Sequence, residues 1–133
     1  MLAKMIIKSY KDLEVWQKSI DIVKEVYAAS KSFPKDERFG LTSQIRRSAI
    51  SIPSNIAEGK SRQHINEYIQ FLYIAFGSSS ELNTQLLIAG ELQFLSNSEL
   101  CVLTEKLDHV SRMLQNLIKS LKRKPITVNR EPK

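Results

Sequence analysis

The sequence contains few of the residues that make turns. Its 133 residues include 4 glycines and 4 prolines, about half the usual share of these two residues. Because a β-sandwich or a β-barrel needs a turn every few residues, this scarcity excludes a protein built from many short strands. We therefore expect a single all-α domain made of a few long helices.

The sequence also lacks pairs of cysteines and long apolar runs. A single cysteine excludes a disulfide framework and a thiolate zinc site, and it fits a reducing compartment. The longest apolar run, 71–76, is far shorter than the roughly 20 residues of a membrane helix. The first ten residues have neither the apolar core nor the cleavage site of an export signal. We expect a cytoplasmic protein with no membrane partner.

Apolar residues recur at steps of three and four in four segments, which predicts four helices. These segments cover residues 11–32, 41–59, 63–89 and 96–122. Three short connections and one apolar stripe per helix are typical of an antiparallel up-and-down four-helix bundle. We expect its core to span about 10–122, followed by a flexible basic tail over 123–133 within the single domain 1–133.

The few turn-forming residues predict where the helices end or bend. Pro34 disfavours helical geometry in the residue before it, and Gly59 is a suitable left-handed terminator. Pro53 lies inside the second segment and removes one backbone hydrogen bond, so we expect a kink or a restart of the helix near Ile52. Ser96 and Glu99 have the spacing of a capping box at the start of the fourth helix.

Two helices carry more than one apolar stripe. For the first helix we expect the main core face to be Leu13, Trp16, Ile20, Val23 and Tyr27, with a second stripe beside it at Val15, Ile22 and Val26. The third helix has further apolar residues off its core stripe, namely Phe71, Ile74, Leu87 and Ile88. On the second helix, Arg46, Ile50, Pro53 and Ala57 form a partly apolar stripe that a monomer would leave exposed. This surplus of apolar surface predicts self-association into a homo-oligomer.

The sequence offers little for catalysis. It has no glycine-rich phosphate loop, no nucleophile elbow and no HExxH pair. His64 and His109 do not stand in the Glu-x-x-His spacing of a di-metal bundle. Cys101 has no basic or histidine neighbour within a helical turn, so we expect a small packing residue rather than a nucleophile. We expect a non-enzymatic protein with no metal and no cofactor.

A polar stripe runs along the second helix beside its apolar face. Its members are spaced four and three apart: Gln44, Ser48, Ser51, Asn55, Glu58 and Arg62. One interpretation is a solvated face. The other is a seam of hydrogen-bonding groups that packs against another helix or another subunit and fixes its register.

The net charge of +6 is unevenly distributed. Residues 38–62 carry +4 and residues 119–133 carry +5, whereas residues 63–118 carry −4. From these two blocks we select as candidate nucleic-acid contacts Arg46, Arg47, Lys60, Arg62, Lys119, Lys122, Arg123 and Lys124. No aromatic residues are interleaved with them, so contact would be mainly to phosphates. The alternative is charge that only keeps the protein in solution or suits a helix dipole.

The segment 44–59, QIRRSAISIPSNIAEG, resembles the bacterial four-helix-bundle family named for open reading frames in intervening sequences of 23S ribosomal RNA genes. Supporting matches are YKDLEVW at 10–16, FGL at 39–41, and Gly77-Ser78 with Glu81-Leu82 and Gln85-Leu86. The similarity extends from Tyr10 to about Leu121, so the basic tail lies outside it.

The resemblance implies a bundle that assembles into a ring-like homopentamer. It also implies kinship with accessory proteins of diversity-generating retroelements, which are basic pentamers that bind nucleic acid and a reverse transcriptase. No catalytic residues are established for the family. Our leading hypothesis is a homo-oligomeric bundle that binds ribosomal RNA or another nucleic acid through its basic blocks. The rival hypothesis is a protein-interaction scaffold, or a retroelement accessory protein that partners a reverse transcriptase.

Overall fold

The computed structural model describes residues 9–130, and within them the side chains of residues 9–123. Four helices make up most of this range: α2 (Glu14–Ser30), α3 (Leu41–Lys60), α4 (Ile65–Glu91) and α5 (Asn97–Arg130). Two short 3-10 turns, η1 (Tyr10–Asp12) and η2 (Lys35–Glu37), precede α2 and α3. No strand occurs in the described range, so the prediction of an all-α chain with four long helices is confirmed.

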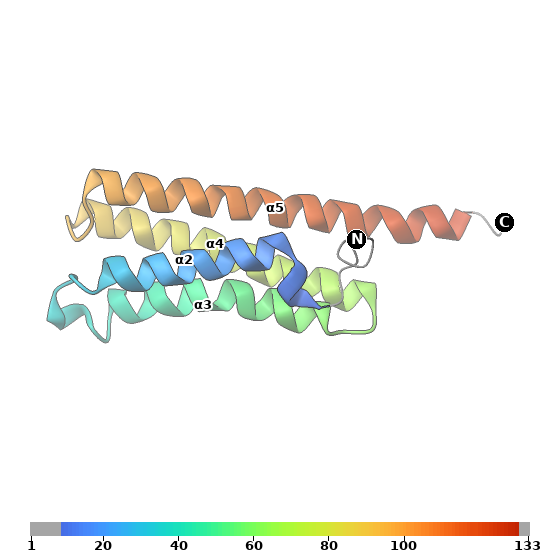
Figure 1. Cartoon of the computed structure of the whole chain (residues 1–133), viewed down its shortest axis with the longest axis horizontal. Helices are drawn as coiled ribbons and strands as arrows, with labels where there is room; N and C mark the ends of the chain where they lie inside the picture. Colours follow the sequence, from blue (N-terminus) through green and yellow to red (C-terminus); the bar gives the residue numbers. More distant parts are fainter. Residues whose placement is uncertain (1–8, 131–133) are drawn as a thin grey trace.

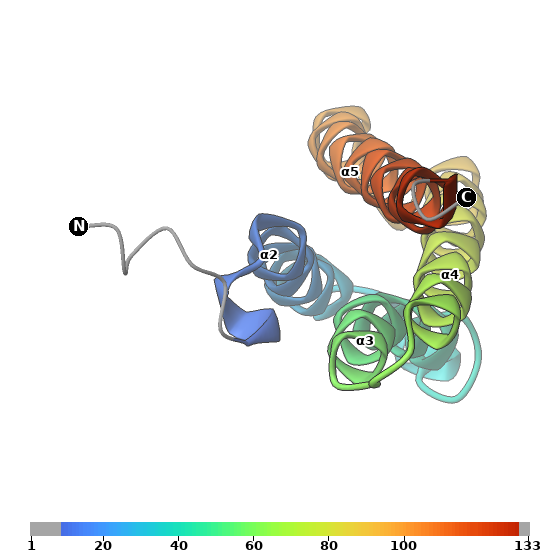
Figure 2. The same ribbon diagram turned by 90° about the vertical axis from the view of Figure 1, so that its right-hand side faces the viewer.

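The four helices lie along one common axis (Figure 1). The α2–α3 and α4–α5 connections lie at one end of the molecule, and the α3–α4 connection lies at the other. Seen from that second end, α2 and α4 are diagonally opposed (Figure 2), and α3 packs most extensively against α4. Side chains from all four helices meet in one core, among them Ile22, Ile52, Leu72 and Leu114, each almost fully buried.

The first helix is shorter than predicted, and a different stripe faces its core. Leu13 has an extended backbone, so α2 begins at Glu14 after the separate turn η1. The buried side is the second stripe, Val15, Ile22 and Val26, together with Ser19 and Ser30. The hydroxyls of Ser19 and Ser30 donate hydrogen bonds to backbone carbonyls three residues earlier. Both serines are therefore hydrogen-bonded within their own helix and take up little space in the core. The predicted main stripe therefore lies at the flank of α2.

Gly59 does not terminate α3 in a left-handed conformation, and that prediction is wrong. The helix continues to Lys60, and no glycine in the described range has a positive φ. Gly59 is buried inside the helix because Tyr68 and Phe71 of α4 pass directly over it. Pro53 is also buried within α3, which is assigned as one uninterrupted helix. The left-handed residue is instead Gln93, in the turn after α4.

Helix α5 begins as predicted and ends later than predicted. The Ser96 hydroxyl accepts from the Glu99 amide at 3.1 Å, and the Glu99 carboxylate accepts from the Ser96 amide at 2.9 Å, which completes a capping box. The helix continues to Arg130, past the predicted end near Lys122. A proline such as Pro125 removes only one bond of the helical ladder, so it can bend a helix without ending it. The predicted flexibility of residues 131–133, and the side chain of Lys124, lie outside the described part of the chain.

No helix within the described residues combines the length and the hydropathy that a membrane crossing requires. α4 is the most apolar of the four helices, but its outward face is interrupted by Glu67, Glu81 and Glu91.

Candidate nucleic-acid interface

Most of the candidate basic residues gather at one end of the bundle. Lys60 is the last residue of α3, and Arg62 follows it in the connection to α4. Near the other end of the chain, the Lys122 ammonium donates to the Tyr73 hydroxyl of α4 at 2.6 Å. The fold thereby brings parts of both basic blocks to the end where α4 begins (Figure 1).

Three aromatic side chains from the first turns of α4 lie among these charges. The Lys60 ammonium is 5.7 Å from the centre of the Tyr68 ring, and the Arg62 guanidinium is 5.0 Å from that of Phe71. The Lys122 ammonium is 5.1 Å from the centre of the Tyr73 ring. No aromatic residue is interleaved with these basic residues in the sequence, but the fold brings three rings beside them from α4, a separate stretch of the chain.

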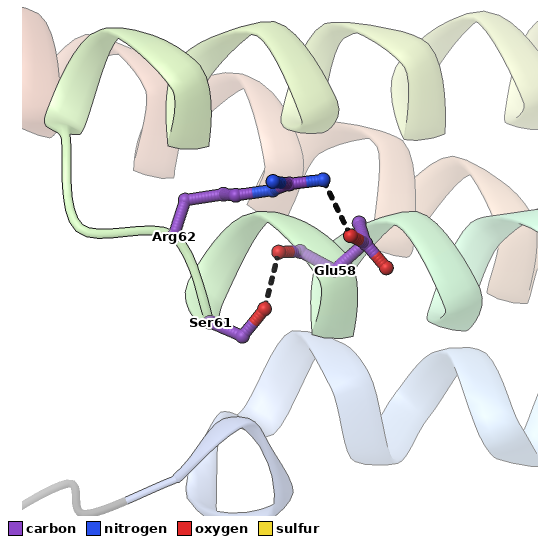
Figure 3. A network of polar contacts seen from close by, with 3 residues as sticks. All are labelled: Glu58, Ser61 and Arg62. Atoms are coloured by element: carbon purple, nitrogen blue, oxygen red, sulfur yellow. Dashed lines mark hydrogen bonds and ion pairs between the residues drawn. The ribbon is translucent and has the colours of Figure 1, made fainter.

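These contacts hold the cations in place without removing all of them from solvent. Arg62 pairs with the Glu58 carboxylate at 2.6 Å, and the Ser61 hydroxyl donates to the Glu58 carbonyl at 2.8 Å (Figure 3). Both partners of the ion pair are about half exposed, so a phosphate can compete with Glu58 for the guanidinium. Lys119, Lys122 and Arg123 are exposed on the adjacent part of α5. Burial raises the pKa of the Tyr68 phenol further above physiological pH, so the ring beside Lys60 is uncharged.

Arg46 and Arg47 lie elsewhere, toward the middle of α3. Arg46 is turned toward α2: its Nε donates to the Ser30 hydroxyl at 2.8 Å, and its guanidinium lies 4.5 Å from the centre of the Tyr27 ring. Arg47 is exposed on α3. The structure therefore separates these two arginines from the basic end and gives Arg46 a packing role.

Replacing Arg46 by alanine should destabilise the fold by about 1–2 kcal/mol, because it removes the stacking on Tyr27 and the hydrogen bond to Ser30. Urea unfolding of Arg46→Ala measures this loss. The matched control is Arg47→Ala on the next residue, whose expected change in unfolding free energy is within about 0.5 kcal/mol. Equal unfolding midpoints for the two variants would contradict the packing role.

The polar stripe of α3 is packed at its centre and exposed at its ends. The Ser51 hydroxyl is 2.8 Å from that of Ser78 on α4, and the Asn55 amide donates to the Ser51 hydroxyl at 3.0 Å. Ser48 is buried beside them, whereas Gln44 and Glu58 are exposed. The structure thus places Ser48, Ser51 and Asn55 at the α3–α4 contact within one chain.

Neither metal binding nor nucleophilic chemistry is supported by the geometry of the described residues. Among residues 9–130 no three His, Cys, Asp or Glu side chains are grouped so that they could hold a metal ion. Cys101 is exposed rather than packed, which corrects the prediction, because it lies on the outer side of α5. Its thiol donates to Glu105 at 3.6 Å, and the Glu105 carboxylate raises its pKa, so the reactive thiolate is disfavoured.

Comparison with known proteins identifies a family and similar solved structures. The model of the 23S rRNA-intervening sequence protein family matches residues 11–116. A crystal structure of a protein with unknown function from the S23 ribosomal protein family, from Bacteroides thetaiotaomicron, is similar with a TM-score of 0.74 and 23% sequence identity. This similarity covers 79% of this chain and 98% of that one. No curated protein matches. Because the family model covers well over half of the chain, the chain belongs to the 23S rRNA-intervening sequence protein family.

Proposed function

We propose that this chain is a non-enzymatic, homo-oligomeric helical bundle that binds RNA through the basic end defined by Lys60, Arg62, Lys119, Lys122 and Arg123. The observation that carries the proposal is that α3, α4 and α5 bring these cations together from two distant blocks of the sequence. The antiparallel up-and-down arrangement, the bend at Pro53, the pentameric state and the cytoplasmic location inferred from the sequence remain predictions that accompany it.

The chemistry of the basic end favours phosphate over base recognition. Tyr68 is buried, and Lys60, Arg62 and Lys122 each lie close to one of the three aromatic rings. Of the three rings only Tyr73 is exposed (46%), so base stacking would be limited to this ring. Clustered cations neutralise phosphates and release counterions, so binding would be strongly dependent on salt and only weakly dependent on sequence.

The test uses a labelled fragment of 23S ribosomal RNA and the variant Lys119→Glu/Lys122→Glu. We expect the double variant to bind about tenfold or more weakly at low salt, with a salt slope smaller by about 1–2 because two phosphate contacts are lost. The matched control is Lys24→Glu/Lys31→Glu, which makes the same change in net charge on and just after α2. Equal losses in both variants, or no binding by the natural sequence at low salt, would contradict the proposal.

A second candidate function is a scaffold for a partner protein. Its supporting observation is the row of exposed apolar side chains on α4, namely Tyr73, Ile74, Leu87 and Ile88. The resemblance to retroelement accessory proteins suggests a reverse transcriptase as that partner. Binding to a purified reverse transcriptase that survives nuclease treatment and is lost in Leu87→Glu would favour the scaffold over the RNA-binding function.

A further inference from the structure

Helix α4 has an apolar ridge on the side that no other described helix covers. Ile74 is 51% exposed and Ile88 is 44% exposed, and each stands seven residues from Glu81. Seven residues correspond to two turns, so the three side chains lie in one row. Gly77 lies beside this row, and a Cβ placed on it would meet no atom within 4 Å. The centre of α4 therefore contains a glycine that no contact among the described residues requires.

Helix α2 lies diagonally opposite α4 (Figure 2). Together with α3 and Tyr10 of η1, it encloses an apolar groove of about 290 Å³. Its lining includes Trp16 and Ile20 of α2, and Ile50, Pro53 and Ala57 of α3. Ile50 is 42% exposed, so the groove presents apolar surface to solvent. These residues include most of the α3 stripe that the sequence predicts to be left exposed. Part of that stripe is covered after all, since Pro53 is buried.

A charged residue lies at the centre of the ridge, and another lies at the rim of the groove. Glu81 lies between the two isoleucines of the ridge. Arg47 stands three residues before Ile50 and seven before Ser54, so it lies on the same side of α3 as these two lining residues, at the rim of the groove. Both are exposed, and neither takes part in any ion pair found within residues 9–123. The ridge is therefore apolar with an acidic residue at its centre, and the groove is apolar with a basic residue at its rim.

We infer that the α4 ridge of one copy of this chain seats in the α2–α3 groove of a second copy, with Glu81 of one copy beside Arg47 of the other. This inference rests on the self-association that is part of the proposed function and assigns it a surface. Since an isoleucine stands two turns on either side of Glu81, apolar contact along the groove forms in either helix direction. Gly77 then has a role, because the absence of a side chain lets a neighbouring helix approach α4 closely.

The charges favour this contact over the packing of α4 against α4 in a symmetric dimer. Residues 65–91 include three glutamates and no lysine or arginine, so two α4 ridges would bring acidic groups together with no cation between them. The ridge and the groove are different surfaces of one chain, which makes the contact heterologous. Such contacts generate closed rings or open filaments.

The test is a charge exchange between the two surfaces, read as molar mass by light scattering over a range of protein concentrations. Arg47→Glu and Glu81→Arg should each weaken assembly about tenfold or more, because each places like charges side by side. The double variant Arg47→Glu/Glu81→Arg restores the opposite charges and should recover assembly to near that of the natural sequence. The matched control, Lys18→Glu, makes the same change in net charge on the side of α2 that faces α5, away from both surfaces, and should assemble normally.

The outcomes separate this inference from the self-association on which it rests. A natural sequence that stays monomeric at every concentration would contradict self-association itself. An oligomer that Arg47→Glu leaves unchanged would overturn the groove as the partner surface, while self-association would stand. Two weakened single variants whose double variant is no better would overturn the pairing of Glu81 with Arg47. Circular dichroism confirms that each variant is helical, which is expected because both side chains are exposed.

Discussion

Replacing Gly59 by alanine should destabilise the protein by about 3 kcal/mol, although it adds only one methyl group. A Cβ at this position would lie 2.7 Å from the Phe71 Cβ and 3.2 Å from the Tyr68 carbonyl oxygen, both fixed parts of α4. Neither atom can rotate away, so α3 and α4 would have to separate along their contact, the most extensive in the bundle. Overpacking of this kind costs about 1–3 kcal/mol, and loss of the close helix contact adds to it. The better helix propensity of alanine, about 1 kcal/mol, offsets only part of this cost. Urea unfolding at concentrations at which the chain is monomeric measures the loss.

The control is the same substitution at Gly77, in the middle of α4. There an added Cβ has open space around it, and alanine is the better helix former by about 1 kcal/mol. Gly77→Ala should therefore raise the unfolding free energy of the monomer, and the two glycine variants should shift the urea midpoint in opposite directions. An unchanged midpoint in Gly59→Ala would show that α3 and α4 are more loosely packed than the structure places them.

The position of Gly59 also ties the fold to the proposed RNA-binding end. Tyr68 and Phe71, which cover Gly59, are the rings against which Lys60 and Arg62 lie. A shift of α4 away from Gly59 would move these rings and alter the spacing of the cations. Gly59→Ala should therefore also weaken binding to the ribosomal RNA fragment, whereas Gly77→Ala should not.

The four helices could be predicted from the sequence because apolar spacing reports directly on helical periodicity. The sequence could not predict which of the two apolar stripes of α2 faces the core. Val15, Ile22 and Val26 lie inside with Ser19 and Ser30, whereas Trp16, Ile20 and Val23 line the groove. Both stripes have the right spacing, and the choice depends on how closely the neighbouring helices approach. Ser19 and Ser30, on the buried side of α2, are small enough to let the neighbouring helices pack closely. A ranking of the two stripes by hydrophobicity does not detect this effect of side-chain size.

Only the basic residues of the candidate site could be predicted from the sequence, because the way the helices bring them together is not a local property. The two basic blocks are evident from composition, but their meeting at one end depends on the direction of α5 relative to α4. The contact between Lys122 and Tyr73 joins residues from two different helices, so the aromatic part of the cluster has no local signal. Arg46 is the opposite case. It belongs to a basic block of the sequence, but its side chain packs against Tyr27.

Replacing Leu86 by alanine should destabilise the protein by about 3 kcal/mol, whereas the same change at the adjacent Leu87 should have little effect on folding. Leu86 is 1% exposed in the core of the bundle, and Leu87 is 47% exposed on the outer side of α4. Truncation of a buried leucine loses its transfer free energy and leaves a cavity, at a cost of about 2–5 kcal/mol. Truncation of an exposed side chain changes the unfolding free energy by less than about 0.5 kcal/mol.

Because both variants remove the same atoms from neighbouring positions of one helix, helix propensity and composition cancel in the comparison. The difference between their urea midpoints reports only which face of α4 is buried within the chain. This matters for function, since α4 has apolar residues on both faces and only the outer face is available to a second copy or a partner. Equal destabilisation at low protein concentration would mean that Leu87 is also buried within the monomer, and the exposed apolar surface of α4 on which the scaffold function rests would then be smaller than the structure indicates.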